Sequence, residues 1–408
     1  MYYNKLSGLS RELWLVQAGI FLNMLGYGAV LPFEVIYLHD GRGFSLGIAG
    51  LVIGVVTGVA VVAAPIAGPL IDRFGARTAT AGAGIALAAG YAGLAFASSP
   101  ARAFAAAVCA GVGNGALIPG QSTLVAALAP RDLRHRAAAV SRVATNAGMG
   151  LGAALGGLVA EHGLNGFVAL FLANAVTYLV YVVVLVTVVA DSPRPEPIAG
   201  GYRHVFRDRA FVHLALTNVA IIAVGWGVFT WIVPPYARSQ LGVSTGLIGL
   251  LLLANAATVV AAQIPIARLA EGRRRTLMMA VAGWIFVTAC LLVLSASFVG
   301  LAYATLVVAA IAVAVGECFH TTALMPLVAD LAPPGLRGRY MASIGLSWWI
   351  GLALAPTLGT QLLSVSPTAT LLVAAAVAGA AAISVLSLER RLPDAARSTP
   401  RPLISRAP

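Results

Sequence analysis

The chain has 408 residues, of which 60% are hydrophobic and only 10% are charged, with a formal net charge of +12. A soluble domain carries about 25% charged residues, so this composition excludes an ordinary soluble protein. Apolar runs of about 20 residues, long enough for a helix to cross a bilayer core of about 30 Å, separate short charged segments. These runs are apolar on all faces and lack the alternation of β-barrel strands. We therefore predict an all-α membrane protein.

Taken in chain order, the apolar runs predict twelve transmembrane spans. The three cysteines fall within these spans and have no CxxC spacing, so we expect packing residues and neither a metal site nor a cofactor. The spans cover approximately residues 13–38, 46–71, 78–98, 102–128, 137–161, 166–189, 210–236, 245–270, 276–297, 300–331, 340–364 and 368–388.

The chain repeats itself after about 200 residues. A shift of 203 positions lays Pro130 on Pro333 and Arg134 on Arg337. Each half holds six spans, and six is even, so the halves insert in the same orientation, as in a parallel repeat. The sequence therefore predicts two six-helix bundles, over residues 1–190 and 210–389. A proline-rich cytoplasmic linker over 191–209 joins them, and a basic cytoplasmic tail follows over 390–408.

The basic residues are distributed unevenly between the two predicted faces. Arg42, Arg102 and Arg238 alone fall on the face opposite the termini. The positive-inside rule then places both termini in the cytoplasm of a multi-pass protein of the cell (inner) membrane. The positive charge is thereby explained by topology, and nucleic-acid binding is not expected.

The loop between the second and third predicted spans carries the most specific motif. Residues 68–77 read GPLIDRFGAR, which resembles the loop 2–3 signature of the major facilitator superfamily. That resemblance implies a two-bundle transporter in which this loop acts as a charge latch. The alternative is a charged turn that only sets topology. The latch residues would be Gly68, Asp72, Arg73, Gly75 and Arg77.

The fifth predicted span has a glycine-rich stretch over residues 148–157. It resembles the antiporter motif of the twelve-span drug/proton exporters in the same superfamily. Ala153 stands where that motif has a proline. Glycines at this spacing also let helices approach closely, so packing alone remains the alternative.

Two acidic residues lie well inside predicted spans, where a charge is costly. Glu317 is near the middle of its span, with His320 three residues later on the same helix face, and Glu34 is nearer the end of the first span. A carboxyl surrounded by hydrocarbon binds a proton more readily than one in water. We predict Glu317, His320 and Glu34 as proton-coupling residues, with a buried structural acid as the alternative.

Other polar and aromatic residues in the spans are candidates for lining a largely apolar substrate pocket. Each one could instead form a helix–helix hydrogen bond or anchor the chain at the membrane interface. The predicted substrate-binding residues are Asn23, Tyr27, Asn114, Gln121, Arg142, Asn146, Trp226, Trp231, Asn255 and Trp348.

The sequence contains no phosphate-binding GxxxxGK[ST] loop, no catalytic triad pattern and no metal cluster, so we do not expect an enzyme. We predict a monomeric secondary transporter in the lipid bilayer that exports small hydrophobic neutral or cationic compounds, such as drugs, in exchange for protons. A carrier that moves a sugar or another metabolite in either direction is one alternative. A transporter-like membrane receptor is the other.

Overall fold

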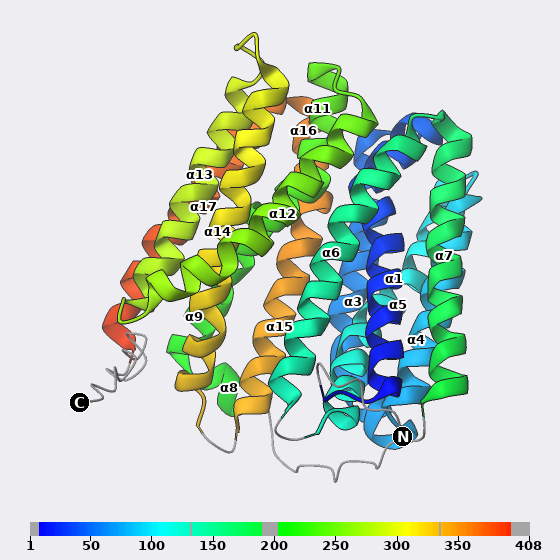
Figure 1. The fold of residues 1–408 in the computed structure, drawn as a ribbon. Helices are drawn as coiled ribbons and strands as arrows, with labels where there is room; N and C mark the ends of the chain where they lie inside the picture. The colour runs from blue at the N-terminus through cyan, green and yellow to red at the C-terminus, as the bar shows by residue number, and fades with distance from the viewer. Residues whose placement is uncertain (1–7, 131–132, 190–202, 334–335, 393–408) are drawn as a thin grey trace. The chain divides into compact units, whose positions relative to one another are not determined.

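The computed structural model describes residues 8–130, 133–189, 203–333 and 336–392 (Figure 1). Within them, twelve helical segments are long and apolar enough to cross a membrane, which confirms the all-α membrane fold with twelve spans. The first runs over Arg11–Gly41, where the sequence predicts 13–38, and the tenth over Ala302–Leu331, where it predicts 300–331.

The helices of the first half follow one another with short connections. They are α1 (Arg11–Val30), η1 (Leu31–Phe33), α2 (Glu34–Ile36), η2 (Tyr37–Gly41), α3 (Leu46–Phe74), α4 (Ala76–Ala95), α5 (Pro100–Leu128), α6 (Arg134–Ala160) and α7 (Gly163–Val188). The predicted linker falls largely in residues 190–202, outside the described residues.

The second half begins with a short helix and contains more interruptions. Its helices are α8 (Arg203–Arg207), α9 (Arg209–Ile222), η4 (Ala223–Val228), α10 (Phe229–Trp231), α11 (Val233–Leu241), α12 (Thr245–Ala270), α13 (Arg275–Ser295), α14 (Ala302–Leu331), α15 (Arg337–Leu354), η6 (Ala355–Gly359), α16 (Thr360–Val365), α17 (Pro367–Leu388) and η7 (Glu389–Arg391). Most of the predicted tail, from residue 393, lies outside the described residues.

Serine residues cap several of the spanning helices. The hydroxyls of Ser10 and Ser366 accept backbone hydrogen bonds three residues ahead, each at 3.2 Å, and start α1 and α17. Ser45 and Ser99 do the same for α3 and α5. Such caps satisfy amides that the first helical turn leaves without a partner, so these local signals fix where the spans begin.

The chain forms two compact units that do not coincide with its two sequence halves. Unit 1 comprises residues 1–199, 230–256 and 353–365, and unit 2 comprises 200–229, 257–352 and 366–408. Segments of the second half therefore pack with the first six spans. A division into two six-helix bundles at the linker stays a prediction.

In unit 1, α1 packs against α6 and α7, and α4 packs against α5 and α7. Glycines on α6 allow α1 and α6 to approach each other closely. A Cβ atom added at Gly148 would lie 2.7 Å from the carbonyl oxygen of Phe21 on α1. The face of α6 turned away from α1 meets α12, because a Cβ at Gly150 would lie 2.6 Å from that of Ala256. The glycine-rich stretch thus packs on two sides.

In unit 2, α13 packs against α14 and α17, and α17 packs against α9. An ion pair joins the ends of α13 and α14, where Arg275 Nη1 lies 2.6 Å from Asp330 Oδ2. Arg275 is buried. A buried guanidinium without a counter-charge would be costly, so this pair holds the two helix ends together.

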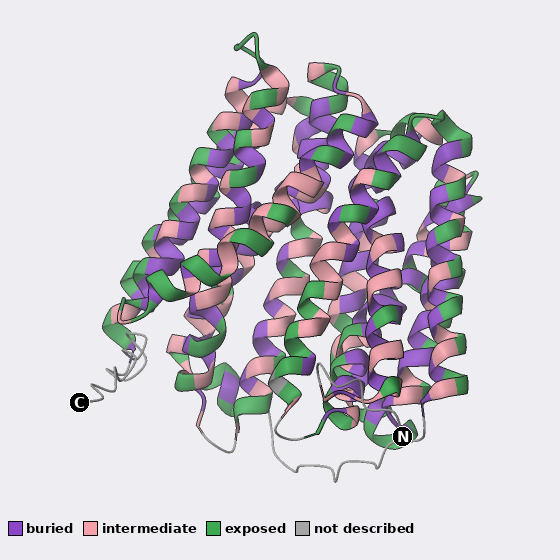
Figure 2. Cartoon of the chain, viewed as in Figure 1, coloured by how far each residue is buried: buried purple, intermediate pink, exposed green. Residues whose placement is uncertain are grey.

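Many helices expose large apolar side chains. Figure 2 shows exposed and buried residues alternating along the helices. Ile85, Val183, Ile264 and Leu358 are each more than half exposed. Apolar side chains in such positions are favourable when the surrounding solvent is lipid rather than water. The exposed faces thus agree with the membrane location that the hydropathy predicts.

Candidate functional site

Glu34 lies where the first span changes its helical geometry. Pro32 lies within the 3₁₀ turn η1, and the chain then passes through α2 into the π-helical turn η2. A proline lacks the amide that would continue the α-helical ladder, which accounts for the interruption. Departures from α-helical geometry of this kind often mark functional positions. The side chain of Glu34 is buried, with 2% of its surface exposed.

Two neutral donors hold the carboxyl group of Glu34. The hydroxyl of Tyr91 on α4 donates to Oε1 at 3.1 Å, and Nε1 of Trp231 on α10 donates to Oε2 at 3.0 Å. In the described part of the chain, no basic side chain forms an ion pair with Glu34. The carboxyl can therefore gain or lose a proton without breaking an ion pair.

Tyrosine rings surround this carboxyl site within unit 1. The ring of Tyr27 on α1 meets that of Tyr91 edge-on at 6.3 Å, and the ring of Tyr178 on α7 stacks on Tyr91 at 6.1 Å. Tyr27 was predicted to bind substrate, and the structure places it beside Tyr91, half-buried. The ring cluster excludes water from the carboxyl group.

A second polar cluster lies in unit 2 around His320, which is fully buried on α14. Its Nε2 lies 2.8 Å from Oδ1 of Asn218 on α9, and Nδ2 of Asn218 donates to Oγ of Ser347 on α15 at 2.7 Å. Since an amide oxygen only accepts, Nε2 of His320 carries the proton. Nδ1 of His320 has no hydrogen-bond partner in the described residues.

Aromatic rings close over this histidine. The ring of Trp226 lies 5.3 Å from that of His320 and 4.8 Å from that of Trp348. Phe286 packs edge-on against Trp226 at 6.1 Å. Nε1 of Trp348 is buried without a partner in the part of the chain described. Of the predicted pocket residues, the structure thus brings Trp226 and Trp348 together.

Glu317 lies three residues before His320 on α14, so the two positions share a helix face. Glu317 is half-buried in the middle of α14, and its carbonyl accepts from Thr321 at 2.9 Å. His320 uses its bonded nitrogen for Asn218 instead. A residue on the same helix face and residues on neighbouring helices compete for a hydrogen bond with His320. Here the side-chain amide of Asn218 on α9 forms it. Whether Glu317 binds a proton stays a prediction.

The remaining predicted pocket residues differ in their surroundings. Asn23 is buried with both side-chain polar atoms unpartnered among the described residues, Asn114 is buried, and Gln121 is buried with Nε2 unpartnered. Arg142 is exposed, and its carbonyl accepts from Nδ2 of Asn146 at 3.1 Å. Of the others, Asn255 is half-buried and Trp231 contacts Glu34.

The predicted latch loop joins α3 to α4 through Gly75, whose φ of +86° is a conformation that favours glycine. Asp72 and Arg73 are exposed, and the guanidinium of Arg73 lies over the ring of Phe74 at 5.2 Å. Arg77 donates to the carbonyl of Val186 at 3.1 Å. Among the described residues Asp72 forms no ion pair, and its role in a charge latch stays a prediction.

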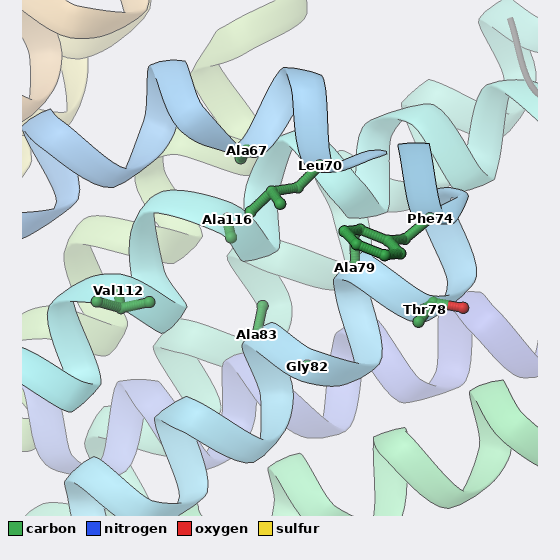
Figure 3. A pocket seen from close by; sticks show the side chains of 9 residues that line it. All are labelled: Ala67, Leu70, Phe74, Thr78, Ala79, Gly82, Ala83, Val112 and Ala116. Atoms are coloured by element: carbon green, nitrogen blue, oxygen red, sulfur yellow. The ribbon is translucent and has the colours of Figure 1, made fainter. Parts of the chain in front are cut away.

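A shallow groove opens beside this loop, between α3, α4 and α5 (Figure 3). Gly68 and Asp72 belong to the α3 segment on its border but do not line it. Its lining is apolar apart from one hydroxyl, which gives no group to bind a polar substrate. The lining residues are Ala67, Leu70, Phe74, Thr78, Ala79, Gly82, Ala83, Val112 and Ala116.

Sequence reasoning missed two residues that hold these sites together. Tyr91 lies in a helix of alanines and glycines, and a single tyrosine there has no distinctive pattern. Asn218 is a lone amide in an apolar span, a signal that could have been used because unpaired polar groups in membranes are costly. In each case the partner lies on another helix.

Known proteins match the chain over most of its length. A sequence profile of the Major Facilitator Superfamily matches residues 18–233 and 215–407. The multidrug resistance protein MdtH of Aeromonas hydrophila is 26% identical over 347 residues, which cover 83% of this chain and 84% of that protein. The uncharacterised MFS-type transporter YttB of Bacillus subtilis is 25% identical and covers 86% of this chain and 88% of its own length.

Solved structures share the fold at low sequence identity. A peptide transporter POT in complex with sulfate has a TM-score of 0.81 at 16% identity, covering 95% of this chain and 96% of its own. A D-xylose–proton symporter has a TM-score of 0.76 at 15% identity, and the match covers 92% of this chain and 97% of the symporter. Since the family profile matches well over half of the residues, this chain belongs to the Major Facilitator Superfamily and is a transporter rather than an enzyme.

Proposed function

We propose that the chain exports small hydrophobic neutral or cationic compounds, such as drugs, in exchange for protons. The observation that carries this proposal is the buried carboxyl of Glu34, held by the neutral donors Tyr91 and Trp231. A carboxylate that is already neutralised by an arginine has little tendency to bind a proton. Glu34 has no such partner in the described residues, so it can serve as the proton carrier.

Glu317 is a second candidate for the proton site. It is half-buried at the centre of α14, one turn before His320. Acids at such depth in membrane helices commonly belong to proton or ion pathways. Replacement of either acid by glutamine removes the titratable group and preserves the shape, which separates their contributions.

The aromatic cluster of unit 2 supports a substrate with apolar or cationic character. Trp226, Trp348 and Phe286 present rings around a single histidine. Tryptophan faces attract cations and bury apolar groups. The name of the Aeromonas relative, a multidrug resistance protein, agrees with such a substrate.

The arginine distribution supports an orientation in a cell membrane with both termini in the cytoplasm. Gln240 lies on the opposite face in this topology, at the exposed end of α11. A cysteine placed there should react with a membrane-impermeant maleimide added outside intact cells. Labelling only after the cells are broken would contradict the orientation.

A substrate screen in proteoliposomes under an imposed pH gradient tests the function. The purified chain is supplied with ethidium as a lipophilic cation, with D-xylose and with a dipeptide. We expect ethidium alone to accumulate in the acidic lumen, and we expect Glu34→Gln or Glu317→Gln to abolish that accumulation. Transport of D-xylose or the dipeptide would favour the metabolite carrier instead. Binding of one of these compounds without any transport would favour the receptor.

A further inference from the structure

Besides apolar packing, four polar side-chain contacts among the described residues of unit 1 join the first six spans to segments from the second half of the chain. We call them the joining contacts. Trp231 donates to Glu34 at 3.0 Å, and Arg238 lies 3.4 Å from Asp40. The amide of Gly246 donates to Glu161 at 3.2 Å, and Nε2 of Gln361 donates to the carbonyl of Gly47 at 3.0 Å.

The joining contacts differ in how they respond to protons. The Arg238–Asp40 pair is roughly half exposed on both sides, and such pairs contribute little to stability. The Gln361–Gly47 hydrogen bond has no titratable group. Glu161 is an exposed carboxylate at a helix end. Of these four contacts between described residues, only the Glu34–Trp231 bond joins a buried titratable side chain to a donor from the second half.

Protonation changes this buried bond in a defined way. With Glu34 ionised, Tyr91 and Trp231 both donate to a carboxylate. With Glu34 protonated, its O–H can donate to the Tyr91 hydroxyl, which both donates and accepts, while the Trp231 N–H can only donate to the remaining carbonyl oxygen. Hydrogen bonds to a charged acceptor are roughly twice as strong as neutral ones. Protonation therefore weakens the bond to Trp231 without removing it.

We propose that Trp231 is a positioning residue that couples the protonation of Glu34 to the packing of residues 230–256 and 353–365 against the first six spans. Ionised Glu34 favours the packed arrangement, and protonated Glu34 favours its release. By linkage, release of these segments makes Glu34 bind its proton more tightly. The inference rests on the proposed function in that it uses the same carboxyl.

The described side chains that face Glu34 are phenols and an indole, so Glu34 is the one carboxyl group in this cluster. Tyr27 of α1, Tyr91 of α4 and Tyr178 of α7 are phenols, and Trp231 of α10 does not titrate. Arg42, which follows the same span, donates to the Tyr37 hydroxyl and to the carbonyl of Ala95 rather than to Glu34.

Distance measurements by electron paramagnetic resonance test the proposal. In a background with Cys109, Cys290 and Cys318 replaced by alanine, nitroxides are placed at Asn165 on α7 and Gln240 on α11, both exposed. The full-length protein in nanodiscs is measured from about pH 5 to about pH 9, above the titration range of an ordinary carboxyl group in water and below that of a phenol. We expect the short-distance population of the packed arrangement to grow as the pH rises.

Trp231→Phe keeps the buried ring and removes the N–H donor. Because a charge-assisted bond exceeds a neutral one by roughly a factor of ten in equilibrium terms, we expect the packed-to-released ratio at high pH to fall about tenfold and its pH response to flatten. Trp284→Phe, at a half-exposed tryptophan, is the matched control and should behave as wild type. A Trp231→Phe protein with the wild-type titration would overturn the proposal.

Glu34→Gln provides the second variant and separates this inference from the proposed function. We expect its distance distribution to be independent of pH and to match that of the wild type at low pH. A pH response as large as that of the wild type would also overturn the proposal. If Glu34→Gln abolishes pH-driven transport while Trp231→Phe keeps the wild-type distance titration, the inference about Trp231 fails and the proton site stands. If Glu34→Gln transports normally, the proposed role of Glu34 fails.

Discussion

The packing of α6 against α1 allows a quantitative prediction for Gly148→Ala. The new Cβ would lie 2.7 Å from the Phe21 carbonyl oxygen, 0.7 Å short of the 3.4 Å at which ordinary contact begins, and 2.9 Å from the Met24 Cβ. Since the obstructing atoms belong to the backbone and to a Cβ, the two helices must move apart. Such overpacking costs about 1–3 kcal/mol, while alanine gains roughly 0.5–1 kcal/mol over glycine in a helix. The difference ranges from about 0 to about 2.5 kcal/mol, and we expect a net loss of about 1 kcal/mol.

Thermal unfolding in detergent measures this loss as a shift of the apparent Tm. One kcal/mol shifts Tm by about 2–4 °C in proteins of 150–250 residues, and by less in a longer chain. Gly58→Ala on α3 is the control, because nothing lies within 4 Å of a Cβ added there. That variant should keep or raise the Tm. Equal shifts for the two variants would refute the reasoning from close helix approach.

The other predictions concern buried polar contacts and the loop after α3. Asn218→Ala leaves the bonded nitrogen of His320 without its acceptor, so we expect a loss of about 1–3 kcal/mol, measured as a lower Tm; an unchanged Tm would contradict it. Asp330→Asn weakens the ion pair of the buried Arg275, so we expect a loss of up to about 3 kcal/mol that persists in high salt. A loss that salt abolishes would argue for a surface pair. Asp72→Asn should slow transport about fivefold or more in a protein that still folds normally. An unchanged transport rate would remove the support for a latch.

The fold could be predicted from the sequence because hydropathy and helix length together determine where a chain crosses a bilayer. The exact ends of the spans were less predictable than their number. The sequence predicts a seventh span over 210–236, but the spanning segment ends at Trp231, because Pro234 and Pro235 start a new helix. The two units were not predictable, since they depend on contacts between residues far apart in the chain.

The candidate site could be predicted only in its separate parts. Glu34 and Trp231 were each predicted, one as a proton site and the other as a substrate contact, but 197 positions separate them and no local pattern links them. Tyr91 completes the carboxyl site without any sequence signal. Helical spacing places Glu317 and His320 on one helix face, but it could not indicate that the Asn218 amide on another helix bonds to the histidine.

Proton-driven accumulation of ethidium in proteoliposomes, compared between wild type and Glu34→Gln, tests the central claim most directly. Glu271→Gln, at an exposed acid after α12, serves as the control. With an acidic lumen, we predict accumulation by the wild type and the control and none by Glu34→Gln, while ethidium exchange without a gradient continues in all three. Equal gradient-driven accumulation by Glu34→Gln and wild type would contradict the account.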